Sequence, residues 1–479
     1  MARPIVAAVF LCFVSAALAG CAVISPTDPY PPAVAADFHP KPAVNTVKKD
    51  AGKTGSTDNV QRNALTLKMA VDTAIANNPG LAAARHETEM AEARHTQALA
   101  RALPSVSAMG GYTHYTDDQR LMPPNLNGDP GVFGDDIYSA DIVITQPLFT
   151  GGRLIKEIGA AKLLALAAEH RLSRTKKELV FNVTSVFYSI LAQKKVVDAL
   201  KFSKTTMDEH LRRVNSLIDQ KKAARVDRLR TEVRLADIEQ KLTAAENLLA
   251  IQTRVLANLM GIRADLIDAS GLEGDLAEAL QSQVDTERSV SAAFKNRSDY
   301  LAARAALEAA AKKVDAARAE HWPSVTLEGT YGMRWAHNPS DYPAGTDRSD
   351  DLGRVGVFMK LPVFESGLIS GKVKEERAAL GVARERLRAL ELAIRLEVET
   401  AALNIRNAHK RVVTTKKAVD QAEETLRIER EKYELGRGSI TDVLDAQSAM
   451  LDSQTGYYKA LADFNTAIAQ MRLATGEIK

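Results

Sequence analysis

The sequence predicts a mainly α-helical chain with a membrane β-barrel component, built from one unit that occurs twice. Three observations support this fold class. Ala, Leu, Glu, Lys and Arg predominate from residue 60 onward, a composition typical of long helices. An internal repeat relates the two halves of the chain. Each half also has two segments in which apolar and polar residues alternate, which is the period of a β-strand.

Length and charge place the chain among ordinary folded proteins. It has 479 residues, of which 46% are hydrophobic and 26% charged, so it is long enough for several domains. Its 63 basic and 60 acidic residues leave a net charge of +3. This balance gives no field that would gather nucleic acid, and we expect no nucleic acid partner.

Residues 1–20 have the features of a signal peptide: Arg3, then an apolar stretch from Ile5 to Leu18, then small residues. "LAGC", which ends at Cys21, resembles the lipobox of bacterial lipoproteins and predicts lipidation of Cys21. Ordinary cleavage after Ala19, leaving Cys21 free, is the alternative. Residues 21–64 are then the lipid anchor and a flexible tether, because they are rich in Pro, Ala, Lys and Thr without periodicity.

The repeat begins at the short helices. "NNPGLAAAR" from Asn77 aligns with "NRSDYLAAR" from Asn296, and "LPSVSAMGGY" from Leu103 aligns with "WPSVTLEGTY" from Trp322 at the same offset. After a variable loop, "QPLFTGG" from Gln146 matches "LPVFESG" from Leu361. The first repeat therefore covers 65–262 and the second 289–479, with a linker or equatorial segment at 263–288.

Each repeat is expected to contain two strands and then one helical hairpin. The alternating segments lie at about 105–116 and 137–149 in the first repeat, and at about 324–337 and 352–364 in the second. The hairpins follow at 152–260 and 367–474, where apolar residues recur by threes and fours. The first helix of each hairpin would be about 100 Å long at 1.5 Å per residue, too long for a compact domain.

Four strands with one apolar and one polar face cannot close a barrel. An open sheet in lipid would leave backbone groups unpaired, so the chain is expected to oligomerise. Three copies would make twelve strands, although periodicity alone does not fix three. Tyr112, Tyr115, Tyr138 and Trp335 lie where an interfacial aromatic girdle belongs. The alternative is a soluble antiparallel sheet covered by the short helices.

No motif of an enzyme is found. The nine histidines are scattered, and neither H-x-x-x-H nor H-E-x-x-H nor a G-x-S-x-G before a helix occurs. We therefore expect no catalytic residue, no metal site and no cofactor.

The stretch "LGRGSITDVLDAQ", Leu435 to Gln447, interrupts the second hairpin with two glycines and resumes it with two carboxylates. Asp442 and Asp445 are three residues apart and share one helix face. Asp442 alone could simply favour the start of the returning helix, where the helix dipole prefers negative charge. Asp445 is less well explained in that way.

The stretch "YELGRGSITDVLDAQ" and the duplicated unit resemble the TolC-like outer-membrane efflux proteins, in particular the lipid-anchored OprM-like kind. This resemblance implies a homotrimer in which a trimeric α-barrel continues a shared 12-stranded β-barrel. It implies an exit duct for a tripartite efflux or type I secretion system in the outer membrane. The partners would be a periplasmic adaptor, an inner-membrane pump of the RND or ABC type, and outer-membrane lipid.

The resemblance also implies roles for residues of the hairpin turns. Asp442 and Asp445 match the carboxylates of the periplasmic entrance gate, and Tyr433 and Asp227 match a contact that closes it. The turns themselves would contact the adaptor through Gly436, Arg437, Gly438, Lys221 and Lys222.

The first hairpin departs from the family pattern in two places. Lys221 stands where the family usually has glycine, which disfavours a turn with positive φ. Arg230 stands at the place corresponding to Asp445, so the first hairpin does not duplicate the acidic pair. A merely solvated basic turn is an equally good interpretation of Lys221 and Lys222.

Two other functions stay open at this point. A lipid-anchored periplasmic coiled-coil scaffold or adaptor would conduct nothing, but it would not need four strands of membrane length. Protein secretion would use the same duct as small-molecule export, so the sequence does not separate the two.

Overall fold

A computed structural model describes residues 65–120, 133–221, 224–267, 269–276, 285–336 and 349–478. The predicted lipidation site Cys21 and the turn residue Lys222 lie outside these ranges. The described residues form two compact units. One contains the strands, within 100–151 and 321–363, and the other contains the helices.

The strand unit is one antiparallel sheet in the order β1-β2-β3-β4. Its strands are β1 Ser105–Arg120, β2 Phe133–Phe149, β3 Ser324–Ala336 and β4 Ser349–Lys360. The predicted pair of strands in each repeat is thus confirmed, and β2 pairs with β3 across the repeat boundary. β4 ends at Lys360 rather than at 364, and Pro362, just beyond it, has no N–H to donate to a ladder.

Side chains of the sheet are ordered across the strands. Tyr112, Tyr138 and Trp335 are register partners on β1, β2 and β3, with ring centroids 5.0 Å and 5.4 Å apart. Arg334 and Asp141 form an ion pair of 2.7 Å between β3 and β2, and their side chains are only 21% and 13% exposed. Cross-strand pairs of this kind stabilise the register of a sheet.

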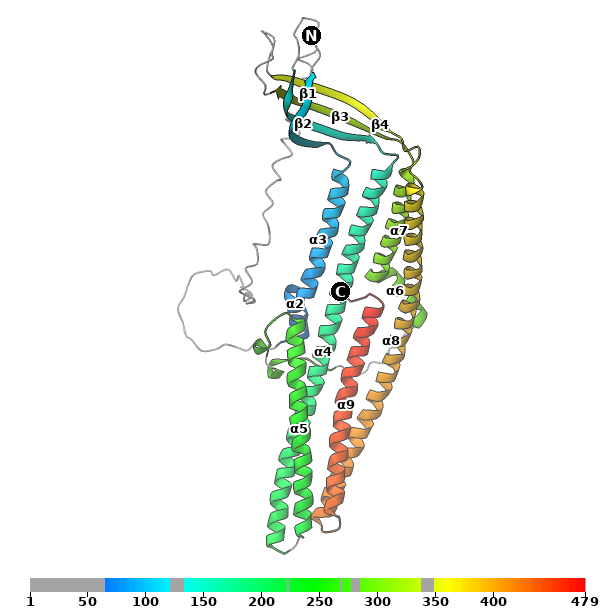
Figure 1. The fold of residues 1–479 in the computed structure, drawn as a ribbon. Coiled ribbons are helices and arrows are strands. Elements are labelled where there is room, and N and C mark those ends of the chain that lie inside the picture. The colour runs from blue at the N-terminus through cyan, green and yellow to red at the C-terminus, as the bar shows by residue number, and fades with distance from the viewer. Residues whose placement is uncertain are drawn as a thin grey trace, which may run out of the picture. The chain divides into compact units, whose positions relative to one another are not determined.

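The helical unit repeats one arrangement of four helices (Figure 1). The first copy contains α2 Leu67–Asn77, α3 Pro79–Ala100, α4 Arg153–Asp219 and α5 Arg225–Leu259, followed by the short η2 Ala264–Leu266 and η3 Ala269–Gly271. The second contains α6 Thr286–Asn296, α7 Ser298–Ala319, α8 Leu368–Glu434 and α9 Ile440–Ala474. Among the described helices, none has a stretch long and apolar enough to cross a bilayer.

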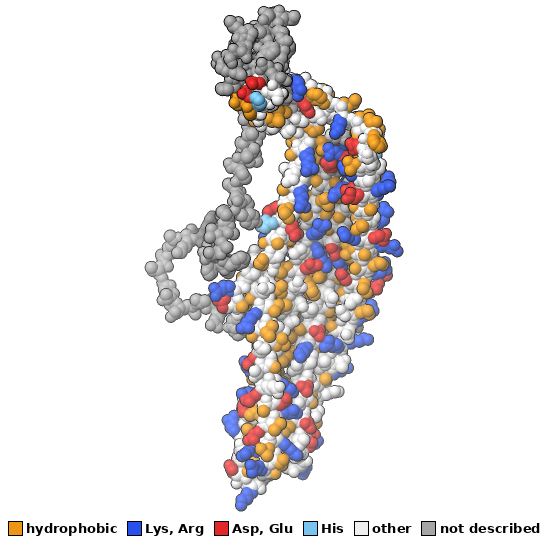
Figure 2. All heavy atoms as spheres, viewed as in Figure 1, with side chains coloured by type: hydrophobic (Ala, Val, Ile, Leu, Met, Phe, Trp, Pro, Cys, Tyr) orange, Lys and Arg blue, Asp and Glu red, His pale blue; other side chains and the backbone are white. Residues whose placement is uncertain are grey.

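The three largest apolar clusters among the described residues hold the helices together, and a small one of Ala167, Ala302 and Ala305 joins α4 to α7. Of the three, one packs α2, α4 and α5 around Val183, Phe187 and Leu256, and another packs α6, α8 and α9 around Ile394, Val398 and Phe464. The third, here called the hairpin seam, joins the two hairpins; it consists of Val196, Val197, Leu200, Met207, Ile238, Ala245, Ile440, Leu444 and Leu451. Basic and acidic side chains are interspersed over the exposed face of the hairpins (Figure 2).

The two repeats use different chemistry at the same junction. Between α2 and α3, the Asn78 amide donates to the Leu259 carbonyl over 2.9 Å. Between α6 and α7, Arg297 takes the equivalent place and donates to the Ala474 carbonyl over 3.4 Å. Arg297 is 1% exposed and also donates to Asp299 over 2.6 Å and to Glu397 over 2.5 Å. A buried guanidinium is therefore compensated by two carboxylates.

The two hairpin turns share a left-handed backbone conformation at one equivalent position, although the residues there differ. Gly436 has a φ of +70° and donates to the Tyr433 carbonyl. Lys221, at the equivalent place, has a φ of +61° and donates to the Ile218 carbonyl over 2.8 Å. The lysine therefore adopts the left-handed conformation that its side chain disfavours and that Gly436 adopts in the second turn.

Replacement of Arg297 by Asn, the residue of the first repeat, should leave Glu397 without the cation it binds here and leave Asp299 with only the 3.8 Å contact to Arg174. We expect a loss of about 3 kcal/mol in the free energy of unfolding, measured as a lower thermal midpoint by circular dichroism in detergent. Burial would raise the pKa of Asp299, but the hydrogen bond and charge of Arg297 outweigh it and lower this pKa below its ordinary 3.8.

The stabilisation from a lowered carboxyl pKa is present above the ordinary pKa and disappears as the pH falls through the lowered one. The difference between wild type and Arg297→Asn should therefore shrink in strong acid. Arg304→Asn, at an exposed position of α7, is the matched control. Equal melting of the two variants at neutral pH would contradict the role of Arg297.

Lys221→Gly should relieve the left-handed strain and stabilise the first turn by up to about 1 kcal/mol. Amide hydrogen exchange at the turn should then slow by up to about fivefold. Lys221→Ala keeps a Cβ and should give no such gain. Exchange in the glycine variant that is as fast as in the alanine variant would show that no strain is stored at this position.

Candidate functional site

The predicted site residues lie at the end of the helical unit where both hairpins turn. The hairpin seam fixes this end, because Ile440 and Leu444 of α9 are buried against the first hairpin, 4% and 6% exposed. With Ile440, Val443 and Leu444 buried, Thr441, Asp442 and Asp445 of the first turns of α9 are exposed.

Asp442 and Asp445 are both exposed but have different surroundings. Asp442 Oδ2 accepts a hydrogen bond from the Ser439 N–H over 3.3 Å, and Ser439 Oγ accepts from the Thr441 N–H over 3.1 Å. Asp442 therefore caps α9, as the structural interpretation of the sequence proposed. Asp445 takes no part in the cap, is 75% exposed and has Arg234 Nη2 at 3.8 Å.

Tyr433 lies half-buried at the end of α8, where it packs on the hairpin seam and against His210, with ring centroids 5.8 Å apart. Burial and the nearby charge of Asp227 raise the pKa of the Tyr433 hydroxyl. Asp227 Oδ2 itself accepts from the Ala224 N–H over 3.2 Å, which repeats the capping role of Asp442 in the first hairpin. Among the hydrogen bonds of the described residues, none joins Tyr433 to Asp227.

Burial lowers the pKa of His210, and the charges of Arg213 and Arg430 lower it further. The imidazole is therefore neutral near neutral pH. It gives the ring of Tyr433 an uncharged neighbour.

Two separate features favour glycine at the second turn. Gly436 has a positive φ, and Gly438 has no room for a side chain, because a Cβ there would lie 3.0 Å from the Lys432 Cβ. Arg437, between them, donates its backbone N–H to the Lys432 carbonyl over 2.8 Å and is exposed. The exposed turn residues Gly436, Arg437 and Lys221 are thus presented together at one end of the unit.

Three arginines of the first hairpin contact the second hairpin around this site. Arg213 Nη1 donates to Glu434 over 2.9 Å, Arg230 Nη1 donates to Thr441 Oγ1 over 3.2 Å, and Arg234 Nη2 donates to the Leu444 carbonyl over 3.3 Å. Sequence reasoning singled out only Arg230. The neighbouring sequence does not indicate the roles of Arg213 and Arg234, because their partners lie 221 and 210 residues away in the chain.

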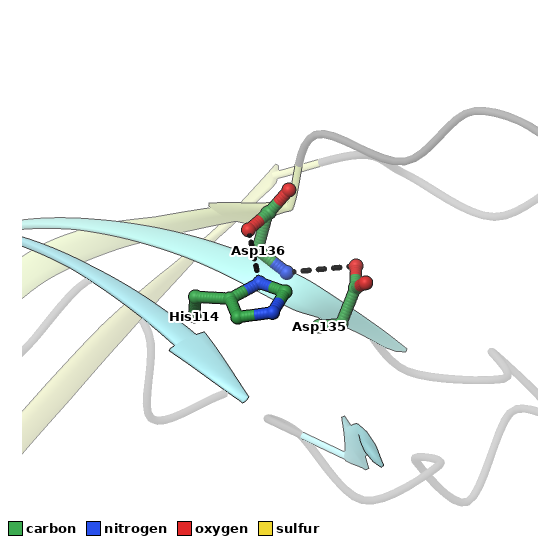
Figure 3. Close-up of side chains that lie close together, drawn as sticks. All are labelled: His114, Asp135 and Asp136. Carbon is green, nitrogen blue, oxygen red and sulfur yellow. Dashed lines mark hydrogen bonds and ion pairs between the residues drawn. The ribbon is translucent and has the colours of Figure 1, made fainter. Parts of the chain in front are cut away.

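The sheet contains one further cluster that sequence reasoning missed, formed by His114, Asp135 and Asp136 among the described residues (Figure 3). Its possible metal-ligand atoms lie within 4.8 Å of one another. His114 Nδ1 lies 2.7 Å from Asp136 Oδ1, and the Tyr112 hydroxyl donates to the same oxygen over 2.7 Å. Asp135 accepts from the Asp136 N–H over 2.9 Å. These hydrogen bonds account for the arrangement of the three side chains.

Comparison with known proteins places the chain in a family. The family model described as outer membrane efflux protein matches residues 70–262 and 289–477. The outer membrane protein TolC of Vibrio cholerae serotype O1 is 21% identical over 404 residues, which cover 84% of this chain and 88% of that protein. A probable efflux pump outer membrane protein of Pseudomonas putida, TtgC, is 23% identical over 410 residues, covering 81% and 78%.

Solved structures give the same fold. The outer-membrane channel OprN has a TM-score of 0.72 at 19% identity, covering 86% of this chain and 89% of that chain. The outer membrane protein VceC of Vibrio cholerae has a TM-score of 0.71 at 20% identity, covering 86% and 96%. The duplicated helix, strand-strand and long-hairpin order and the matched family model lead to one conclusion: the chain belongs to the outer membrane efflux protein family.

Proposed function

We propose that this chain is the outer-membrane exit channel of a tripartite efflux or type I secretion system and conducts substrates passively. The observation that carries the proposal is the combination, in a member of this family, of a sheet with alternating faces and two hairpins whose first helices have 67 residues each. A channel of this kind needs no catalytic residue, because the partner pump supplies the energy.

The proposed channel is a homotrimer. β1 and β4 are the two edges of the sheet, and lipid offers no hydrogen bonds to edge strands. Pairing β1 of one copy with β4 of the next would close a 12-stranded barrel and satisfy both edges. The helical hairpins of three copies would form the trimeric α-barrel on the periplasmic side.

The proposed partners are a periplasmic adaptor and an inner-membrane pump of the RND or ABC type. Two relatives support an efflux role by their names, an antibiotic efflux pump outer membrane protein and a toluene efflux pump outer membrane protein, both of Pseudomonas putida. The exposed turns with Gly436, Arg437 and Lys221, together with Lys222, are the proposed adaptor contact. Lipidation at Cys21 would anchor the chain in the outer membrane.

The non-conducting scaffold is the weaker alternative. A scaffold does not need a four-stranded sheet with strands of 12 to 17 residues in which apolar and polar residues alternate. Membrane-spanning strands need about 9–11 residues, which all four strands supply.

In the proposed trimer, Asp442 and Asp445 form the entrance gate as a ring of carboxylates. Both side chains are exposed, and Asp445 is not used by the helix cap. A ring of carboxylates attracts cations and binds divalent cations. Tyr433 would close the gate through Asp227, whose charge lies near the Tyr433 hydroxyl.

The double substitution Asp442→Ala and Asp445→Ala tests both conduction and the gate. In planar bilayers the wild type should conduct ions, and the variant should need at least about tenfold more divalent cation for the same block. Its single-channel conductance should change as well. Asp420→Ala removes an exposed carboxylate from α8 away from the turn and should leave both values unchanged. If the wild type does not conduct, the proposed channel function is wrong. If divalent cations block the variant as strongly as the wild type, Asp442 and Asp445 do not form the proposed ring.

Tyr433→Phe should favour the open entrance, because it removes a donor equivalent to one hydrogen bond of about 0.5–1.5 kcal/mol. The open fraction in single-channel recordings should then rise about two- to tenfold. Tyr458→Phe, a second partly buried tyrosine against the hairpin seam, is the control. Equal open fractions for the two variants would show that the Tyr433 hydroxyl does not help to close the entrance.

A further inference from the structure

Arg230 and Arg234 bring two positive charges of α5 beside Thr441 and Asp445 of α9. Arg230 Nη1 lies 3.2 Å from the Thr441 hydroxyl, next in sequence to Asp442. Arg234 Nη2 lies 3.8 Å from Asp445 Oδ1 and 3.3 Å from the Leu444 carbonyl. The two arginines are four residues apart and therefore share one face of α5.

These charges exist only on the first hairpin. In the second hairpin the equivalent positions are Asp445 and Ala449, so the repeat carries a carboxylate and a methyl group where the first hairpin has two guanidinium groups. The two arginines do not serve the packing of α4 against α5 within the first hairpin, because both contact α9 of the second hairpin.

The surroundings of the arginines bring little additional charge. Asp237 lies 3.6 Å from Arg234, but it also pairs with Lys241 over 3.2 Å on the same helix. Arg234 therefore faces Asp445, and Arg230 adds a second positive charge at Thr441, the residue before Asp442, while the neighbouring Asp237 and Lys241 balance each other.

The contact with Asp445 acts mainly through charge. At 3.8 Å it is an ion pair but too long for a hydrogen bond, and the Asp445 side chain is 75% exposed. The hydrogen bond of Arg234 to the Leu444 carbonyl holds the guanidinium in place, and its side chain is 27% exposed. A fixed cation thus lies beside a carboxylate that still faces water.

We propose that Arg230 and Arg234 set the charge selectivity of the entrance. With Asp442 and Asp445 they form a constriction of mixed charge, which admits organic substrates that carry a carboxylate or another anionic group. An acidic ring alone would repel such substrates. Leu229 and Val233, exposed on the same stretch of α5 at 46% and 72%, give this surface an apolar part that suits amphiphilic anions. The inference rests on the proposed channel function.

The test is the permeability ratio of K⁺ to Cl⁻, taken from reversal potentials in planar bilayers under a KCl gradient. Removal of both cations by Arg230→Ala and Arg234→Ala should raise this ratio by roughly threefold or more, because the carboxylates are no longer offset. Arg234→Lys on its own keeps the charge while changing the hydrogen-bonding geometry, and its ratio should stay near that of the wild type.

Arg228→Ala is the matched control, since Arg228 lies at the same tip but pairs with Glu232 of its own helix. Its ratio should also stay near the wild-type value. An unchanged ratio in the double variant would overturn the inference, and so would a change in Arg234→Lys as large as in the double variant, which would indicate a purely mechanical contact. Absence of conduction by the wild type would instead overturn the proposed channel itself.

Discussion

The hairpin seam is the constraint on which the arrangement of the other helical features depends. A helix of 67 residues cannot bury itself, and its stability comes from packing one face against other helices. Along the seam, α4 and α5 of the first hairpin meet α9 of the second through Met207, Ile238 and Leu444. Because helix periodicity is fixed, burying Ile440 and Leu444 turns Thr441, Asp442 and Asp445 outward. The positions of the charged residues are thus a consequence of apolar packing.

Duplication supplied the same backbone twice, and the two copies then diverged in side chains. The turn with Lys221 has the left-handed geometry of the turn with Gly436, and the junction at Arg297 repeats the carbonyl contact of Asn78. At the hairpin ends the divergence concerns charge: Asp227 and Asp442 both cap a helix, whereas Arg230 replaces the second carboxylate. The positions that keep their role are those that satisfy backbone groups, and the positions that change are those that face outward.

Much of the fold could be predicted from periodicity. The change from a period of two to a period of 3.6 marked the strands and hairpins, and the repeat supplied each prediction twice. The pairing of β2 with β3 across the two repeats was beyond sequence reasoning, because it depends on how non-local segments are brought together. The rule that a lysine disfavours positive φ did not exclude this conformation at Lys221, whose N–H donates to the Ile218 carbonyl within the turn.

The parts of the candidate site that depend on neighbouring residues were predictable, and the parts that depend on contacts between distant segments were not. Asp442 lies in a local motif, S-x-x-D, whose capping function can be read within four residues. The contacts of Arg213 and Arg234 join helices from different repeats, and His114 meets Asp136 only through strand register. Contacts between distant segments leave no periodic trace in a single sequence.

The contrast between the seam and the polar contacts around it also bears on how the proposed entrance could open. Each exposed ion pair, such as Arg213 with Glu434, contributes at most about 1 kcal/mol. Each large apolar side chain buried in the seam contributes about 1.5–3 kcal/mol. Separating Arg213, Arg230 and Arg234 from their partners therefore costs little, and most of the cost of moving the hairpin ends comes from Ile440 and Leu444, which the seam buries at the same end. In such a movement, Arg230 and Arg234 would both lose contacts that hold the hairpin ends together and shift the charges proposed to set selectivity.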